Sequence, residues 1–113
     1  MSSFVGLDVG TSGARALAVD ETGAVRAEAS ASYELLTPLP GWTEQRPEDW
    51  WRGAQAALRQ VVTQVGGDVA AIGLTGQMHG SVFLDREHRV LRPALLWNDQ
   101  RTERQCVQIT EAV

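Results

Sequence analysis

A glycine-bracketed segment near the start of the chain carries residues that could bind phosphate. The segment contributes Asp8, Gly10, Thr11, Ser12, Gly13 and Arg15. Two glycines let the backbone turn sharply and direct N–H groups at an anion. A preceding carboxylate can hold Mg²⁺ through water, and an arginine adds donors for phosphate. These residues suggest a site for phosphate and magnesium, but a simple β-hairpin turn has the same local composition.

A second segment could contact a small polar ligand. Gln77, Met78 and His79 lie between two glycines and follow an apolar run, 69–75. In open α/β sheets ligands bind beyond the carboxyl ends of strands. An amide and an imidazole can each donate and accept, which suits a polyhydroxylated molecule, and Met78 adds an apolar surface. Taken alone, His79 is explained more simply as a surface or packed histidine.

A third candidate is the run from Trp97 through Asn98 and Asp99 to Arg101. An aromatic face beside amide and carboxylate groups is typical of sugar sites. The same residues describe the start of a helix, because Asn and Asp are strong N-caps. Both interpretations stay open at this point.

The elements that must position these segments begin with three strands. The apolar run 4–9 predicts a buried strand that enters the first turn, and 14–19 should return antiparallel beside it. Alternation from Val25 to Tyr33 predicts a third, half-exposed strand, with Val25, Ala27, Ala29, Ala31 and Tyr33 on one face. Three strands joined by short turns predict a meander.

A helix and a further strand follow. The stretch 34–46 contains Pro38, Pro40 and Gly41 and predicts an irregular loop. Pro47 suits a first helical position, apolar residues recur at helical spacing, and Gly66-Gly67 should end the helix. The run 69–75 predicts a strand buried on both faces, parallel to the first strand.

The remaining residues predict a hairpin and a last helix. The pattern predicts a strand at 81–84 that pairs with 90–91 across a polar turn. Asn98 or Asp99 should cap the last helix, with Cys106, Ile109 and Val113 facing inward. The whole pattern predicts an α/β domain of the ribonuclease H-like (actin-like ATPase) fold, a mixed sheet with flanking helices.

Composition narrows the class of partner. The chain has 113 residues, 43% hydrophobic and 21% charged, which is ordinary for a folded domain. A net charge of -4 and scattered arginines argue against nucleic acid. No run approaches the ~20 apolar residues that span a bilayer, and no signal peptide is evident, so we expect a cytoplasmic protein without a membrane partner.

Taken in order, these segments resemble the FGGY carbohydrate kinase family and, within it, the xylulose kinases. The matching stretches are 6–13, 42–45, 47–51, 76–80, 96–99 and Arg101. The Gln-Met-His-Gly loop is the most specific of them. The resemblance covers essentially the whole chain, as the first portion of the family's N-terminal domain, residues 1–113.

The resemblance implies ATP-dependent phosphorylation of D-xylulose to D-xylulose 5-phosphate, with Mg²⁺ as cofactor. Asp8 would organise magnesium. The turn from Gly10 to Gly13 and Arg15 would attend the phosphate of ATP. Gln77, Met78 and His79 would contact the sugar, with Asn98 and Asp99 as weaker candidates. A homodimer is an expectation for the full-length protein.

The family's catalytic aspartate and adenine site have no counterpart in these residues. We therefore expect a fragment that is inactive alone, with the base beyond residue 113. One alternative is a non-catalytic actin-like module that binds a sugar or phosphate. Another is a ribonuclease H-like nuclease, which needs several converging carboxylates and is opposed by the acidic balance.

Overall fold

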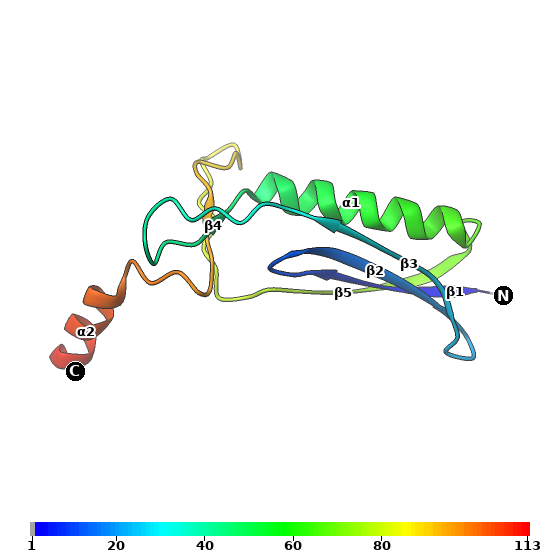
Figure 1. Ribbon diagram of the computed structural model, residues 1–113, viewed down its shortest axis with the longest axis horizontal. Coiled ribbons are helices and arrows are strands. Elements are labelled where there is room, and N and C mark those ends of the chain that lie inside the picture. Colours follow the sequence, from blue (N-terminus) through cyan, green and yellow to red (C-terminus); the bar gives the residue numbers. More distant parts are fainter. Residues whose placement is uncertain (1) are drawn as a thin grey trace. The chain divides into compact units, whose positions relative to one another are not determined.

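The computed structural model describes residues 2–113, which form two compact units (Figure 1). One unit contains the residues up to Glu34 together with Glu48–Gln77, and the other contains Leu35–Pro47 and Met78–Val113. The chain thus leaves the first unit for a loop, returns to it through a helix, and leaves it again after Gln77.

The first unit is built on a mixed sheet of four strands in the order β3-β2-β1-β5. Its strands are β1 (Ser3–Val9), β2 (Gly13–Asp20), β3 (Val25–Ser32) and β5 (Val69–Gly76). β1, β2 and β3 pair antiparallel, and β5 pairs parallel with β1. The predicted meander and the parallel fourth strand are confirmed.

The helix α1 spans Pro47–Gln64, and its ends have local causes. Glu48 and Asp49 lie in the first turn, where the helix dipole favours negative charge. At the other end, Gly67 N donates to Val62 O at 2.9 Å and Gly66 N donates to Thr63 O at 3.1 Å. Both glycines have positive φ, so this is a Schellman motif, as the glycine pair predicts.

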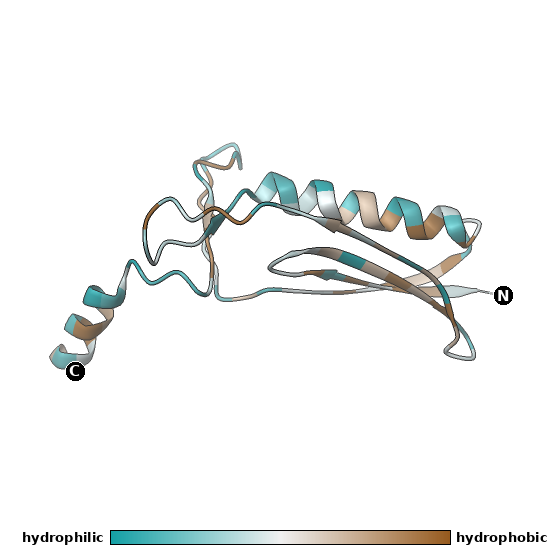
Figure 2. Ribbon diagram, viewed as in Figure 1, coloured by the Kyte–Doolittle hydropathy of each residue, from teal (hydrophilic) through white to brown (hydrophobic). Residues whose placement is uncertain are grey.

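Small residues make up the core between α1 and the sheet. Ala54, Ala57 and Val61 of α1 are buried against seven residues of the first three strands. Those residues are Val5, Leu7, Ala14, Ala16, Ala18, Ala27 and Ala29. Alanines let the helix backbone lie close to the sheet, and the more hydrophobic residues of α1 gather in its second half (Figure 2).

Strand β5 differs from the prediction. Its residues Ile72 and Leu74 pair with Val5 and Leu7, so they share the face on which α1 packs. They are nevertheless 54% and 75% exposed. The helix covers β1, β2 and β3, and within residues 2–113 nothing covers these two side chains. The prediction of burial on both faces is therefore wrong for the described chain.

The second unit has little regular structure. Strand β4 (Glu44–Gln45) pairs antiparallel with β6 (Ala94–Leu95). Isolated bridges join Ser81 to Leu95 and Leu84 to Val90, so the predicted hairpin forms without a continuous strand at 81–84. Strand β4 was not predicted, because prolines precede it and because a strand of two residues has no periodicity.

The last helix, α2, spans Glu103–Ala112 and starts later than predicted. Thr102 occupies its N-cap position without a side-chain cap bond, so neither Asn98 nor Asp99 caps it. Cys106, Ile109 and Val113 are exposed rather than inward-facing. Across residues 2–113, no helix combines the length and the apolar character that crossing a membrane requires.

A glycine in the middle of α1 provides a test of this packing. A Cβ on Gly53 would lie 3.1 Å from Cδ1 and 3.3 Å from Cε1 of Tyr33. Alanine gains about 1 kcal/mol of helix propensity, but overpacking costs more when the neighbour cannot move. The Tyr33 hydroxyl is tied to Gly10 O, so we expect Gly53→Ala to lower the free energy of unfolding by about 1 kcal/mol.

Urea denaturation measures this change. Gly73→Ala is the control, because a Cβ there meets nothing within 4 Å and should cost little. Equal or higher stability for Gly53→Ala would show that the Tyr33 ring yields to the new methyl group.

Candidate active site

The first turn is closed by backbone bonds and supported by one tyrosine. Gly10 N donates to Gly13 O at 3.0 Å, and Tyr33 N donates to Ser12 O at 3.3 Å. The Tyr33 hydroxyl donates to Gly10 O. Burial, with a further contribution from the negative charge of Asp8, raises the pKa of Tyr33, so the hydroxyl keeps its proton. Tyr33 was not identified from the sequence, where it appeared only as the end of an alternating strand.

The glycines of this turn are needed for space. Neither Gly10 nor Gly13 has a positive φ. A Cβ on Gly13 would lie 2.5 Å from Ala31 O, which forces the two strands apart. A Cβ on Gly10 would lie 3.3 Å from Oδ2 of Asp8. Close approach, rather than a left-handed backbone, therefore requires glycine at position 13, whereas at position 10 a Cβ would only crowd the Asp8 carboxylate.

The turn lines an open cavity of about 400 Å³. All six residues predicted for phosphate and magnesium line it: Asp8, Gly10, Thr11, Ser12, Gly13 and Arg15. The remaining walls come from Ala14 and from Ser30, Ala31 and Ser32 of β3. The structure therefore brings the residues of the first motif together around one concave surface with several hydroxyl groups.

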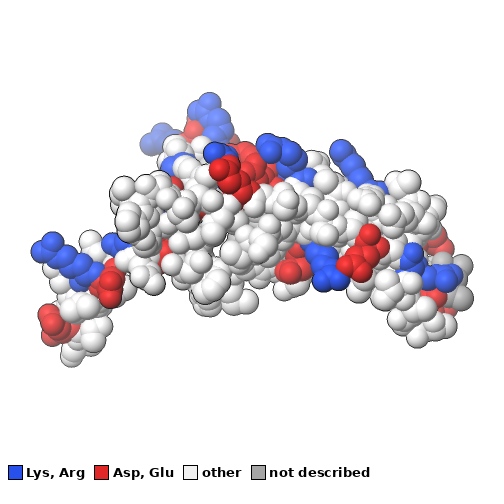
Figure 3. Space-filling model, in the orientation of Figure 1, with Lys and Arg blue, Asp and Glu red and all other residues white. Residues whose placement is uncertain are grey.

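Arg15 is the cation of this cavity and pairs with Glu28 of the neighbouring strand β3. The two side chains are 64% and 47% exposed, and such surface pairs contribute little to stability. On the face seen in Figure 3, positive and negative side chains are interspersed. Arg15 is thus able to exchange its carboxylate partner for an anionic ligand at low energetic cost.

Magnesium fits this cavity only as a shared ion. Within residues 2–113, no group of three or more His, Cys, Asp or Glu side chains could hold a metal. Mg²⁺ usually takes one or two carboxylates and fills its octahedron with water and substrate phosphates. Asp8 is exposed at the carboxyl end of β1 and lines the cavity, so it suits a magnesium ion that arrives with phosphate.

Gln77 connects the second motif to this turn. Its backbone N donates to Val9 O at 2.9 Å, and Thr11 Oγ1 donates to its Oε1 at 3.2 Å. A Cβ on Gly76 would lie 2.8 Å from Val9 O, so glycine is required where the ends of β1 and β5 meet. One predicted sugar residue is thereby held against a predicted phosphate residue.

Met78 and His79 belong to the second unit. Met78 is 67% exposed, and His79 is exposed with φ 64, in the left-handed region. A non-glycine residue in this conformation is strained, and such strain is common at binding loops. The loop is held at its far end, where Ser81 N donates to Leu95 O at 2.9 Å.

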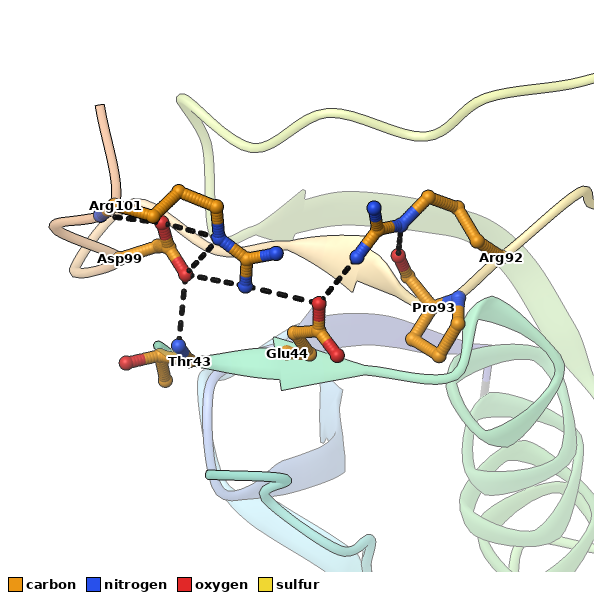
Figure 4. A network of polar contacts seen from close by, with 6 residues as sticks. All are labelled: Thr43, Glu44, Arg92, Pro93, Asp99 and Arg101. Carbon is orange, nitrogen blue, oxygen red and sulfur yellow. Dashed lines mark hydrogen bonds and ion pairs between the residues drawn. The ribbon is translucent and has the colours of Figure 1, made fainter. Parts of the chain in front are cut away.

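The third motif contains a buried ionic network (Figure 4). Oδ2 of Asp99 accepts from Thr43 N at 2.9 Å and from Nη2 of Arg101 at 2.6 Å. Its Oδ1 accepts from Arg101 N at 3.0 Å and from Nε at 2.9 Å. Hydrogen bonds from the Arg101 side chain are the main reason that the pKa of Asp99 is lowered to about 2.

Glu44 extends this network. Its Oε2 accepts from Nη2 of Arg92 at 2.5 Å and lies 2.9 Å from Nη2 of Arg101. The guanidinium of Arg101 also lies over the Trp42 ring, 3.8 Å from the centroid. Glu44 and Arg92 were missed as site residues, because pairs so far apart in the chain leave no spacing signal.

Asn98 directly precedes Asp99, and its side-chain oxygen accepts no hydrogen bond. Its Oδ1 is buried and has no hydrogen-bond partner. Buried acceptors are normally satisfied, so this oxygen stands out as having an unmet bonding capacity. Trp97 beside it is 55% exposed. An open aromatic face next to an unsatisfied amide is an arrangement that suits a sugar hydroxyl.

The Asp99 network makes acid stability testable. Because its folded pKa is depressed from 3.8 to about 2, Asp99 contributes stability that is complete above about pH 5 and is lost as the pH falls towards 2. Asp99→Asn should lower the free energy of unfolding at pH 7 by about 3 kcal/mol, since Arg101 loses one of its two carboxylate partners in a buried setting. It should also flatten the decline of stability between about pH 5 and pH 2.

Urea denaturation across this pH range supplies the comparison. Glu111→Gln, an exposed substitution on α2, controls for the loss of one negative charge. An undiminished decline in Asp99→Asn would mean that other carboxyl groups govern acid unfolding.

Comparison with known proteins assigns this chain to a family. The model of the FGGY family of carbohydrate kinases, N-terminal domain, matches residues 3–113. The xylulose kinase of Bacillus subtilis is 42% identical over 114 residues, covering 98% of this chain and 23% of that protein. The xylulose kinase of Escherichia coli is 40% identical over 111 residues, covering 97% and 23%.

Solved structures agree. The xylulose kinase of Rhodospirillum rubrum superposes with a TM-score of 0.92 at 34% identity, covering 98% of this chain and 23% of that one. Glycerol and gluconate kinases are also among the similar proteins. The chain thus spans about a quarter of the length of these relatives. With its mixed sheet, its actin-like fold and a family model that matches residues 3–113, the chain belongs to the FGGY family of carbohydrate kinases.

Proposed function

We propose that this chain serves an ATP-dependent kinase that phosphorylates D-xylulose to D-xylulose 5-phosphate. The observation that carries the proposal is the junction at the ends of β1 and β5. There Thr11 of the phosphate-type turn bonds Gln77 of the most specific sugar-kinase motif. Xylulose kinases are among the similar proteins, and glycerol and gluconate kinases are too, so the sugar itself is left to experiment.

We assign binding of the transferring phosphate, and neutralisation of its charge, to the cavity lined by the turn after β1. Asp8 would hold Mg²⁺ through water, and the ion would offset the negative charge of the transferring phosphate. The hydroxyls of Thr11 and Ser12 and the guanidinium of Arg15 would contact its oxygens. Phosphoryl transfer depends mainly on positioning and charge stabilisation, which these groups can supply.

On the sugar side, we assign Gln77, Met78, His79 and Asn98 to the pentulose. Imidazole and amide groups can pair with hydroxyls, while Met78 covers an apolar face of the chain of carbons. We place the general base outside these 113 residues, so we expect the chain alone to lack turnover. We further propose that the whole protein works in the cytoplasm, as a homodimer.

Sugar-dependent ADP release by the complete reading frame that encodes this chain tests the proposal. D-xylulose is compared with ribulose, glycerol and gluconate. A higher kcat/KM for xylulose supports the proposed activity. Absence of ADP release with every sugar would favour a non-catalytic module that binds a sugar or phosphate, and preference for another substrate would reassign the specificity.

His79 provides the matching mutational test. His79→Ala should raise the KM for xylulose by about tenfold, the equivalent of about 1.4 kcal/mol of lost binding. His88→Ala is a close control, because His88 has a similar backbone conformation, with φ 62, in a turn of the 84–90 hairpin. Similar KM values for both variants would remove His79 from the sugar site.

Tyr33→Phe tests the support of the phosphate turn. Without the hydroxyl, Gly10 O loses its donor and the turn can reorient, at a stability cost of about 1 kcal/mol. We expect the KM for ATP to rise several-fold while the KM for sugar stays within about twofold. Equal effects on both substrates would point to general loosening of the fold.

A further inference from the structure

We propose that Arg101 is a positioning residue for sugar binding: it fixes the turn 96–101 and so presents Asn98 to the ligand, without touching the ligand itself. The inference rests on the proposed kinase function and deepens it. It also gives Asp99 a different role, because Asp99 then acts through the turn rather than on the sugar.

The Arg101 side chain joins several groups that are far apart in the sequence. Its Nη2 lies 2.6 Å from Oδ2 of Asp99 and 2.9 Å from Oε2 of Glu44. The plane of the same guanidinium lies over Trp42. One side chain therefore ties the end of the turn to the segment 42–44, where β4 begins (Figure 4).

Backbone hydrogen bonds hold the turn 96–101 at both ends. Leu96 N donates to Thr43 O at 3.0 Å, and Gln100 N donates to Gly41 O at 2.8 Å. Asn98 lies midway between these bonds. Its orientation is then set by the residues on either side, and the carboxylate of Asp99 adds the bond from Thr43 N to that frame.

The side-chain oxygens of Asp99 and Asn98 differ in the hydrogen bonds that they already accept. A carboxylate offers about four acceptor sites, and Asp99 uses both oxygens on Thr43 N and on the backbone and side-chain donors of Arg101. The buried Oδ1 of Asn98, in contrast, has no partner. Among the buried side-chain oxygens of the turn 96–101, the one with unmet bonding capacity is therefore on Asn98.

The ion pairs of Arg101 are largely shielded from solvent. The side chains of Glu44, Asp99 and Arg101 are only 8%, 4% and 12% exposed. Removing one charge from a buried group leaves its partners unpaired, which is costly. Lysine keeps the charge but cannot reproduce a planar fork that reaches two carboxylates and stacks on an indole. Arg101→Lys should therefore loosen the turn 96–101 while keeping the positive charge at position 101.

The test measures steady-state kinetics of the complete reading frame. Arg101→Lys should raise the KM for xylulose by about tenfold and leave the KM for ATP within about twofold. Arg89→Lys is the matched control, since Arg89 is 74% exposed and pairs with Asp85 at the surface. We expect Arg89→Lys to match the wild type.

A double-mutant comparison separates positioning from general stability. Asn98→Ala should raise the KM for xylulose by a similar factor. If Arg101 acts through Asn98, the double variant should be little worse than either single variant. Trp42→Leu, which keeps the ion pairs and removes the stacked ring, should give a smaller rise in the same direction, and it serves if Arg101→Lys fails to fold.

Three results would overturn the inference. One is an unchanged sugar KM in Arg101→Lys, or in Trp42→Leu where that variant replaces it. Another is an equal rise in both KM values, and the third is full additivity with Asn98→Ala. A wild-type protein that releases no ADP with any sugar refutes the proposed function and this inference together. An active wild-type protein with a kinetically silent Arg101→Lys refutes the inference alone.

Discussion

Close approach of backbones at the strand ends is the constraint on which the candidate site depends. Gly13 leaves no room for a side chain against Ala31 O, and Gly76 leaves none against Val9 O. The Gly76 contact lies where the ends of β1 and β5 pair, and it places the turn after β1 and the loop after β5 at the same edge of the sheet. A side chain at Gly76 would separate these two strands, and one at Gly13 would separate β2 from β3.

Close approach also governs how the helix α1 packs on the sheet. Alanines on β2, β3 and α1 allow the helix to pack tightly, and Gly53 allows it to touch Tyr33. Tyr33 in turn donates to Gly10 O. A side chain that packs against the helix thus also supports the turn after β1, so packing of the core and the geometry of this turn are coupled in the first unit.

The second unit relies on charge where it lacks regular structure. Its two named strands are only two residues long, and ion pairs among Glu44, Arg92, Asp99 and Arg101 connect its segments. Hydrogen bonds to Asp99 stabilise its ionised form and depress its pKa. A unit with such short strands can hold the turn 96–101 in this way, because charged groups bonded to each other in a buried setting are costly to separate.

The sequence by itself determined the local features: the three-strand meander, the limits of α1, the parallel β5 and the glycine-bracketed motifs. Each follows from periodicity or from residues with special backbone preferences, which act over a few positions. Only the tertiary structure decided the support of Tyr33, the network around Glu44 and Arg101, the late start of α2 and the exposure of Ile72 and Leu74. These depend on which distant segments meet, and neither long-range ion pairing nor the coverage of a sheet face leaves a periodic trace in the chain.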